Sequence, residues 1–417
     1  MKWFQKIDYL FFTLNLISSL VFCQAPSSRW ELVSTLVGDK LYFFGGWVAN
    51  NTASDEVWYI DLSIPFNTAT PPWSKTTNMP VGYNFGSAIY DNDMSSVYLI
   101  GGNAFLPNTP NFTFGHILYA FDTVNSQWST PDVKFDAPFY FPVEMPAVYK
   151  SGKVYAAGGK TALLSDKNQT VINNLTLILD VASMTWSTSL KIPFAPIDHT
   201  ATLLPNGLIV HIGGYTFPMI NMSLIQIFDT NTLSWSTKNA SGDFINARLG
   251  HTAVLTRNGS IIIYGGSLFS SHGPNVCPDL AVLDTNAWIW YIPVLPKENA
   301  PPPLTFHSAA LYNDYMIIAF GRATIVYDNI AINNNIYLFD TNNYLWVTEM
   351  SPPSNTTQTP TIAPVTAIST TQTATTTAPV NTTPAPMNTT TAPVNTTPGP
   401  VNTTPTPVNI KISETKK

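Results

Sequence analysis

A single tryptophan recurs at nearly constant spacing through the middle of the chain, and this periodicity constrains the fold more than any other feature. Successive copies lie 55, 58, 49, 55 and 56 residues apart: Trp73, Trp128, Trp186, Trp235, Trp290 and Trp346. A repeat of this length is typical of stacked supersecondary units, each of which buries its faces against its neighbours. The sequence therefore predicts a repeat architecture.

Two further markers stay in phase with the tryptophans. Five glycine pairs each end an apolar, β-like run, and the sixth copy has one glycine only: Gly45-Gly46, Gly101-Gly102, Gly158-Gly159, Gly213-Gly214, Gly265-Gly266 and Phe320-Gly321. A second apolar run then ends in aspartate: Asp61, Asp122, Asp180, Asp229, Asp284 and Asp340. The tryptophan follows that aspartate by six residues in five repeats and by twelve in the first. Markers that stay in phase through six repeats are a strong signal of a repeat architecture.

Each repeat is predicted to form a four-stranded antiparallel sheet. Glycine allows positive φ and close backbone approach where the second strand ends. Aspartate caps the turn between strands three and four, and tryptophan fills the space between neighbouring sheets. One such sheet cannot bury both faces alone, so we expect the sheets to stack radially and close into a ring. The predicted fold is all-β, a six-bladed propeller with repeats at about 29–73, 74–128, 129–186, 187–235, 236–290 and 291–350.

This pattern resembles the kelch repeat, and the array from Arg29 to Met350 is similar to a kelch β-propeller. The glycine pair, the aromatic strand and the spaced tryptophan match in order. The sequence departs from the pattern at Phe320-Gly321 and in the six-residue insertion before Trp73. The family includes the central domain of galactose oxidase and many binding propellers without enzymatic activity.

The N-terminus has the pattern of a secretory signal peptide. Lys2 and Lys6 precede an apolar run of 15 residues, 9–23, and small residues follow it. This run is short for a membrane span, which needs about 20 residues. We expect residues 1–25 to be removed and 26–350 to form the propeller; the alternative is an uncleaved anchor.

The composition changes abruptly after Met350. Residues 351–417 contain 22 threonines and 12 prolines. This segment cannot build a core, so we expect a disordered, mucin-like stalk with O-linked sugars. No apolar tail follows, so we expect either a released protein or a sequence that lacks its true end.

Charged residues make up only 11% of the chain, and the net charge is -6. This disfavours nucleic acid as a partner, since binding to phosphates needs a basic patch. The two cysteines exclude a disulfide framework and a four-cysteine zinc site.

The strand order predicts where a ligand binds. The loops between strands two and three, and those between blades, vary in length and lie on one face, whereas the other turns are short and nearly constant. Variable loops on a rigid scaffold commonly carry function. The predicted ligand-binding residues follow the glycine motifs: Trp47, Phe105, Tyr215, Phe269 and Arg322. Aromatic faces and a guanidinium group suit the binding of a sugar or an acidic side chain. The alternative is that the aromatic residues only pack between blades and that Arg322 is solvated.

Asparagine sequons occur throughout the chain, and they predict a glycoprotein. Seven lie in the propeller and five in the tail: Asn50, Asn111, Asn168, Asn174, Asn221, Asn239, Asn258, Asn355, Asn381, Asn388, Asn395 and Asn402. Glycans on the first five would crowd the variable face, which favours a central pocket or the opposite face for binding.

Histidines are expected to be structural. His199, His251 and His307 occupy one repeat position at the start of the first strand. His272 and Cys277 share a loop, but two soft ligands without a third do not make a metal site. We expect no metal and no cofactor.

The sequence thus predicts a secreted, cell-surface or cell-wall binding module for an extracellular protein or glycan, without enzymatic activity. Two alternatives remain, a galactose-oxidase-like copper oxidase and a structural cell-wall glycoprotein. The copper site of that family needs two histidines, two tyrosines, a Cys-Tyr cofactor and a further domain. Cys277 is the sole candidate cysteine, and the chain becomes a stalk after Trp346. The ligand itself stays unknown.

Overall fold

A computed structural model describes residues 25–113, 118–135, 142–163, 166–216, 218–268, 276–324 and 330–351. These residues belong to one compact unit, Met1–Ser354, and a second unit comprises Asn355–Lys417. The regular elements among the described residues are all β-strands. None of these residues forms a helix of the length and hydropathy that a membrane span requires. The segments expected to be the signal peptide and the stalk lie outside the described residues, apart from Ala25 and Ser351.

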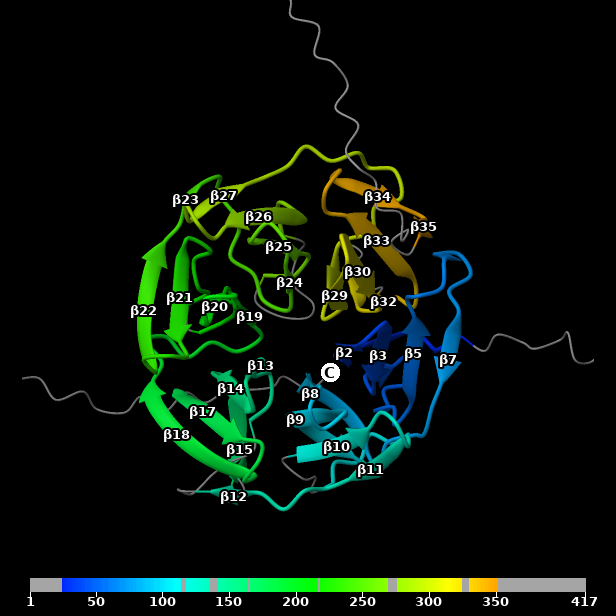
Figure 1. Cartoon of the computed structure of the whole chain (residues 1–417), viewed down its shortest axis with the longest axis vertical. Coiled ribbons are helices and arrows are strands. Elements are labelled where there is room, and N and C mark those ends of the chain that lie inside the picture. The colour runs from blue at the N-terminus through cyan, green and yellow to red at the C-terminus, as the bar shows by residue number, and fades with distance from the viewer. Residues whose placement is uncertain are drawn as a thin grey trace, which may run out of the picture. The chain divides into compact units, whose positions relative to one another are not determined.

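Six sheets, each built from four strands of one repeat in chain order, are arranged around a central axis (Figure 1). From the inner to the outer strand, the first three are β2 (Val33–Val37), β3 (Lys40–Phe44), β5 (Val57–Asp61) and β7 (Trp73–Lys75); β8 (Gly82–Asp91), β9 (Ser96–Phe105), β10 (Leu118–Asp122) and β11 (Gln127–Ser129); β13 (Ala147–Lys150), β14 (Lys153–Ala157), β17 (Leu175–Asp180) and β18 (Thr185–Lys191). The last three are β19 (Thr200–Leu203), β20 (Leu208–Ile212), β21 (Leu224–Asp229) and β22 (Ser234–Asn239); β24 (Thr252–Leu255), β25 (Ser260–Tyr264), β26 (Leu280–Asp284) and β27 (Ile289–Tyr291); β29 (Ser308–Tyr312), β30 (Tyr315–Ala319), β33 (Ile336–Asp340) and β34 (Leu345–Val347). The third and fifth sheets gain a parallel outer strand, β12 (Lys134–Phe135) and β23 (Ser241–Gly242). The predicted all-β propeller fold is confirmed.

The glycine pairs lie where one blade contacts the next. The second glycine of the first pair, Gly46, donates its N–H to the carbonyl of Tyr83 in the second blade (2.7 Å). A Cβ on Gly45 would lie 2.2 Å from the same carbonyl oxygen, which a side chain cannot tolerate. The same bond recurs at the other five junctions: Gly102 to Pro142, Gly159 to Pro196, Gly214 to Arg248, Gly266 to Leu304 and Gly321 to Arg29. Glycine is therefore required by close packing between blades as well as by the turn.

The aspartates and tryptophans act as predicted. Asp61 accepts a hydrogen bond from the backbone N–H of Ser63 (3.0 Å), and the other five aspartates cap their turns in the same way. Trp346 of the sixth blade packs edge-on against Tyr264 of the fifth, with ring centroids 5.5 Å apart. Trp186 is almost fully buried, in a core that spans the second and third blades. The tryptophans thus fill the space between neighbouring sheets.

The ring closes without exchange of a strand between blades. The insertion between β5 and β7 carries a short strand, β6 (Phe66–Asn67), which pairs with β35 (Glu349–Met350) after the last blade. Phe320 occupies the place of the missing glycine at φ 64°, and its ring packs against Phe43 and Trp73 at 5.3 and 5.5 Å. The two departures from the repeat therefore lie at the same place, the junction of the last and first blades.

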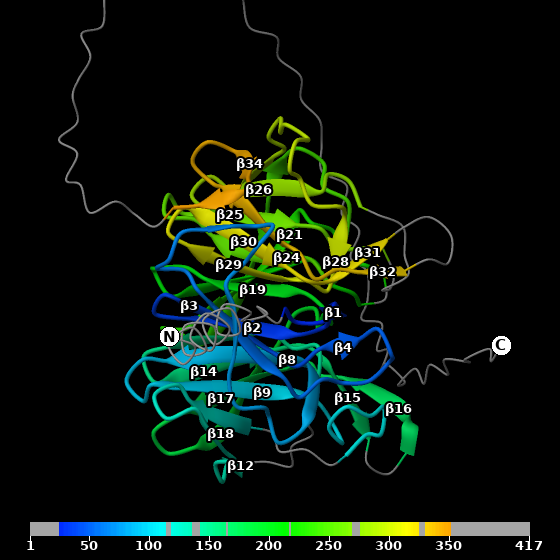
Figure 2. The ribbon, with the colours of Figure 1, turned by 90° about the vertical axis from the view of Figure 1, so that its right-hand side faces the viewer.

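The two faces of the ring differ. Three small additional sheets lie together on one side (Figure 2), and all their strands come from loops between strands two and three or between blades. They are β1 (Arg29–Trp30) with β4 (Trp47–Val48), β15 (Lys160–Leu163) with β16 (Asp166–Ile172), and β28 (Leu304–Thr305) with β31 (Arg322–Thr324) and β32 (Ile330–Ile332). This is the variable face that the sequence predicts.

Candidate functional site at the mouth of the central channel

Each blade places one equivalent residue at the mouth of the central channel on the variable face. In five blades this residue comes just before the inner strand, and in the second blade Phe85 lies within β8. These six residues, which we call the mouth ring, are Glu31, Phe85, Glu144, Asp198, Gly250 and Phe306. All six have left-handed backbone conformations, with φ between 52° and 62°. Five of them carry a side chain, for which this conformation is unfavourable. The surrounding blades hold these residues in place.

A closed circuit of backbone hydrogen bonds holds the mouth ring. Each member donates its N–H to the carbonyl of the member in the preceding blade. The donors and distances are Phe85 to Glu31 (3.1 Å), Glu144 to Phe85 (2.9 Å), Asp198 to Glu144 (3.3 Å), Gly250 to Asp198 (3.0 Å), Phe306 to Gly250 (2.8 Å) and Glu31 to Phe306 (3.1 Å). Because the backbone groups are paired with one another, the side chains of the ring are available for other contacts.

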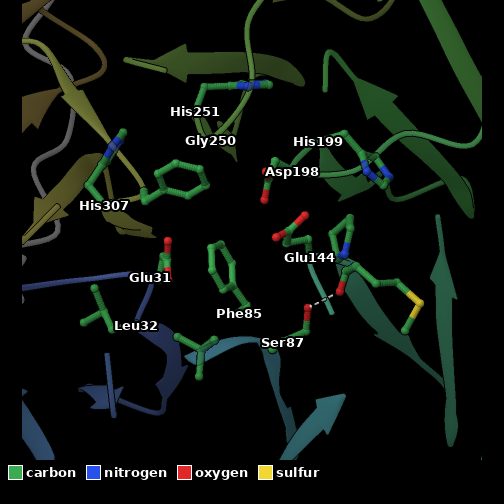
Figure 3. A pocket seen from close by; sticks show the side chains of 15 residues that line it. Glu31, Leu32, Phe85, Ser87, Glu144, Asp198, His199, Gly250, His251 and His307 are labelled. Carbon is green, nitrogen blue, oxygen red and sulfur yellow. Dashed lines mark hydrogen bonds between the residues drawn. The ribbon is translucent and has the colours of Figure 1, made fainter. Parts of the chain in front are cut away.

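The mouth ring surrounds a cavity of about 170 Å³ (Figure 3). The carboxyl groups of Glu31, Glu144 and Asp198 and the ring of Phe85 extend toward its centre. Glu31 and Glu144 are buried, whereas Asp198 and Phe85 are half-buried. The cavity therefore combines three acidic groups with an aromatic wall.

Two of the three carboxyl groups have a polar partner. Glu31 accepts a hydrogen bond from the side-chain amide of Asn84 (2.9 Å), and Glu144 forms an ion pair with Lys160 (2.5 Å). Burial raises the pKa of Glu144 even though Lys160 acts in the opposite direction. Burial and the nearby acids raise the pKa of Glu31 and of Asp198 well above the usual range. The cations of the protein thus compensate only part of the cost of ionising these groups together.

Arg322 lies beside the mouth ring and is buried, so its alternative assignment as a solvated residue is wrong. Its guanidinium group stacks on Trp30, 4.1 Å from the ring centroid. Only 5% of its surface is exposed. Burial lowers the pKa of Arg322, and the Glu31 carboxylate partly restores it. Arg322 therefore contributes a fixed positive charge near Glu31 rather than a mobile surface group.

Two of the predicted aromatic residues lie together on the variable face. Trp47 packs against Phe105 with ring centroids 5.0 Å apart, and Phe105 contacts Phe112 edge-on at 5.4 Å. We call these three residues the aromatic cluster. Phe105 is buried, Trp47 is half-buried and Phe112 is 64% exposed. Trp47 also lies opposite Trp30 in the β1–β4 pair, so the cluster adjoins the mouth.

The remaining predicted positions lie elsewhere. Tyr215 in the fourth blade is half-buried, and its backbone exchanges two hydrogen bonds with Ile197. Phe269 falls outside the described residues. The structure therefore groups Trp47 with Phe105 and places Arg322 against Trp30. Tyr215 belongs to neither of these two groups. Their role in binding stays a prediction.

Most propeller sequons are accessible. The exposed asparagines are Asn50, Asn111, Asn174, Asn221, Asn239 and Asn258. Asn168 lies in β16, and Asn355, Asn381, Asn388, Asn395 and Asn402 fall outside the described residues. Glycosylation stays a prediction at each.

The repeated histidines are buried between blades. His307 Nε2 lies 2.7 Å from the Thr252 hydroxyl of the preceding blade, and His251 Nε2 lies 3.4 Å from the hydroxyl of Thr200. His199 Nε2 contacts His211 Nδ1 at 3.1 Å. Burial lowers the pKa of these histidines, to about 3 for His307, so they are neutral at physiological pH. These contacts fit the predicted structural role.

Cys277 carries a free, exposed thiol, and its proposed neighbour His272 falls outside the described residues. Among the residues that the structure describes, no three His, Cys, Asp or Glu side chains are grouped closely enough to hold a metal ion.

Sequence reasoning missed the acidic side of the mouth ring. The repeat position of His199, His251 and His307 was recognised, but the position that precedes it was not. Only three of the six repeats carry this histidine, but alignment of the inner strands would have placed Glu31, Glu144 and Asp198 at one position. In a chain with so few charges, three acids at one repeat position are a usable signal.

Comparison with known proteins supports the kelch-type assignment. The putative protein tag-53 of Caenorhabditis elegans is 29% identical over 60% of this chain, which spans about 19% of that protein. Kelch domain-containing protein 3 of Rattus norvegicus is 27% identical over 71% of this chain and 78% of its own length. The solved structure of YjhT covers 78% of this chain with a TM-score of 0.58 at 13% identity, a likeness of fold alone.

Propellers of the kelch type are typically protein-interaction modules. The profile of the Attractin/LZTR1 β-propeller matches residues 97–376, which is more than half of the chain. The chain therefore belongs to the Attractin/LZTR1 β-propeller family.

Proposed function

We propose that this protein is a secreted or cell-surface binding module that holds a protein partner on the variable face of its propeller. The aromatic cluster carries the proposal. It presents a largely exposed phenylalanine, Phe112, on a base formed by Trp47 and Phe105. Aromatic residues are enriched in the centres of protein interfaces because they bury much apolar area with little loss of conformational freedom.

The position of the cluster supports this assignment. It lies on the same face as the mouth ring, and β1 and β4 connect the two. A partner seated on the cluster would therefore extend over the channel mouth. The opposite face consists mostly of short turns, apart from the insertion between β5 and β7, and these turns have little freedom to form a specific surface.

An extracellular location is supported by composition and surface. The N-terminal segment has the pattern of a signal peptide, and the exposed sequons are suited to glycosylation. Because Asn50 and Asn111 lie in the loops that carry the cluster, we expect their glycans to limit the partner to the area between them and the axis.

The proposal can be tested with the full chain expressed in a secretory host. Binding to a panel of displayed extracellular domains and to a glycan array is measured for the wild type, for Trp47→Ala and for Phe112→Ser. The matched control is Phe244→Ser, an exposed phenylalanine beside β23 at the outer edge of the fifth sheet.

We expect a protein ligand whose affinity falls at least about tenfold in both cluster variants and stays unchanged in the control. Retention of the whole chain inside the cell would contradict the secreted location. Ligands found only on the glycan array, or equal binding by all variants, would contradict the protein-binding assignment.

A further inference from the structure

We propose that the cavity inside the mouth ring receives a basic side chain, a lysine or arginine, from the partner protein. This inference rests on the proposed binding function and adds the chemistry of the central contact. It stands on the arrangement of three carboxyl groups and an aromatic wall around one cavity.

When all three carboxyl groups are ionised, the charges around the cavity leave an acidic excess. Glu31, Glu144 and Asp198 contribute three carboxyl groups. Lys160 and Arg322 are the two cations that act on them. Lys160 pairs with Glu144, and Arg322 stacks on Trp30. One further positive charge inside the cavity would balance the site, whereas an acidic ligand would add to the repulsion.

One carboxylate oxygen is already placed for such a ligand. Oε1 of Glu144 contacts Lys160, but Oε2 is buried and has no hydrogen-bond partner among the described residues. The side chain of Glu144 is only 4% exposed, and its carboxyl group points into the cavity (Figure 3). A buried acceptor without a donor is destabilising, because the water that it gave up on burial is not replaced. An ammonium or guanidinium group would supply the missing donor.

The size and the walls of the cavity favour one side chain over a larger ligand. A volume of about 170 Å³ is below the roughly 300–1,000 Å³ of pockets for drug-sized molecules. The rings of Phe85 and Phe306 meet edge-on, with centroids 5.7 Å apart. Aromatic rings pack well against the aliphatic stem of lysine and against the plane of a guanidinium group.

Binding of a cation should depend on pH. Without a ligand, the raised pKa values of Glu31 and Asp198 keep part of the site protonated. A bound cation favours the ionised carboxylates, so binding releases protons and becomes tighter as pH rises. The other titratable or charged groups around these carboxyls are His199, His251, His307, Lys160 and Arg322. The three histidines are neutral above about pH 6.5, so they do not produce this dependence.

The test uses the full chain and small probes. Binding of Nα-acetyl-arginine amide and Nα-acetyl-lysine amide is measured by ligand-observed NMR at pH 6 and pH 8. The neutral citrulline analogue and the acidic glutamate analogue serve as ligand controls. The variants are Glu144→Gln and Asp198→Asn, and Glu298→Gln is a matched control at an exposed position.

We expect the basic probes to bind, and to bind more tightly at pH 8, with a loss of at least about tenfold for citrulline and for both cavity variants. Neutralising Asp198 relieves repulsion among the acids, so Asp198→Asn should melt no lower than the wild type. Glu144→Gln also removes the ion pair with Lys160, so it should melt lower, and its binding is measured at a temperature where it stays folded. This combination separates a binding role from a loss of folding.

Equal binding of arginine and citrulline probes would overturn the inference, as would preference for the glutamate probe or displacement of the basic probes by calcium. The outcome is independent of the aromatic cluster. If Trp47→Ala abolishes partner capture while no basic probe enters the cavity, the proposed function stands and only this inference fails.

Discussion

The junction between the sixth and first blades is built differently from the other five. At those junctions a glycine pair lets the backbone of one blade approach a carbonyl of the next. At the sixth, Phe320 replaces the first glycine and fills the space with an aromatic ring, which packs against Phe43 and Trp73. Arg29 lies 5.7 Å from that ring and also pairs with Glu56. All six junctions thus share the close backbone contact, which Gly321 makes with Arg29 at the sixth, and the sixth adds the packing of an aromatic ring.

The difference has a physical reason. Neighbouring blades elsewhere are joined directly by the chain, but the last blade must hold the first without such a link. The ring closure therefore needs extra stabilisation, because closing a long loop costs conformational entropy. The β6–β35 pair and the aromatic core at this junction supply it.

The largest expected effect comes from restoring the repeat at this junction. Phe320→Gly should lower the free energy of unfolding by about 2–4 kcal/mol, because the lost packing outweighs relief of the left-handed backbone. Chemical denaturation measures this change. Gly265→Ala is the matched change at a regular junction, where a Cβ would lie 2.1 Å from the Leu304 carbonyl, and it should also destabilise. A neutral Phe320→Gly would mean that the aromatic closure is dispensable.

The closing strand gives the next effect. Met350 is 1% exposed and lies in β35, within the core shared by the first and last blades. Met350→Ala should cost about 2–3 kcal/mol in the free energy of unfolding and should speed hydrogen exchange in β6. Val294→Ala is the control, since Val294 is 99% exposed. Loss of stability without faster exchange in β6 would argue against this closing role.

The junctions should also differ in how much they contribute to the pH dependence of the unfolding free energy, because some contain a buried histidine and the closing junction does not. His307 is buried between the fifth and sixth blades, whereas Leu32 takes its place in the first blade. Burial lowers the pKa of His307 to about 3 in the folded protein, against about 6.5 when unfolded. As pH falls below 6.5, the unfolded state takes up a proton that the folded state excludes, so the folded protein loses stability.

For this one residue the loss is about 1.4 kcal/mol per pH unit between pH 6 and pH 4. His307→Gln should remove it and make the pH dependence of the unfolding free energy shallower, measured by denaturation at pH 7, 6 and 5. An unchanged slope would mean that His307 is hydrated or protonated in the folded protein.

The smallest expected effect concerns one hydrogen bond at that junction. Thr252→Val removes the hydroxyl that contacts His307 Nε2 and should lower the free energy of unfolding by about 1 kcal/mol. Thr200→Val, whose contact with His251 is longer at 3.4 Å, should cost less. Equal losses in denaturation experiments would contradict the ranking by distance.

Local sequence patterns were sufficient for the repeat architecture. The strands, the aspartate turns and the glycine positions follow from side-chain chemistry within a few residues, so each repeat shows them again. The path of ring closure was not readable, because β6 and β35 are short and are separated by almost the whole propeller.

The candidate site shows the same limit. Trp47 and Phe105 were predicted, because each follows a glycine motif at the start of a variable loop. Their mutual contact was not predicted, since it joins two blades. The sequence showed that Arg322 is an unusual charge at its repeat position, but it did not show that Arg322 is buried against Trp30. That burial arises from the pairing of β28, β31 and β32 beside the first blade.

The sequence by itself determined the fold, because periodic in-phase residues leave a ring of sheets as the arrangement that buries both faces of every sheet. Only the tertiary structure decided which residues share the channel mouth. Glu31, Glu144 and Asp198 come from three blades, and each is unremarkable within its own repeat. The six-bladed closure and its circuit of backbone hydrogen bonds turn them toward one axis, where burial and mutual repulsion make them a single acidic site.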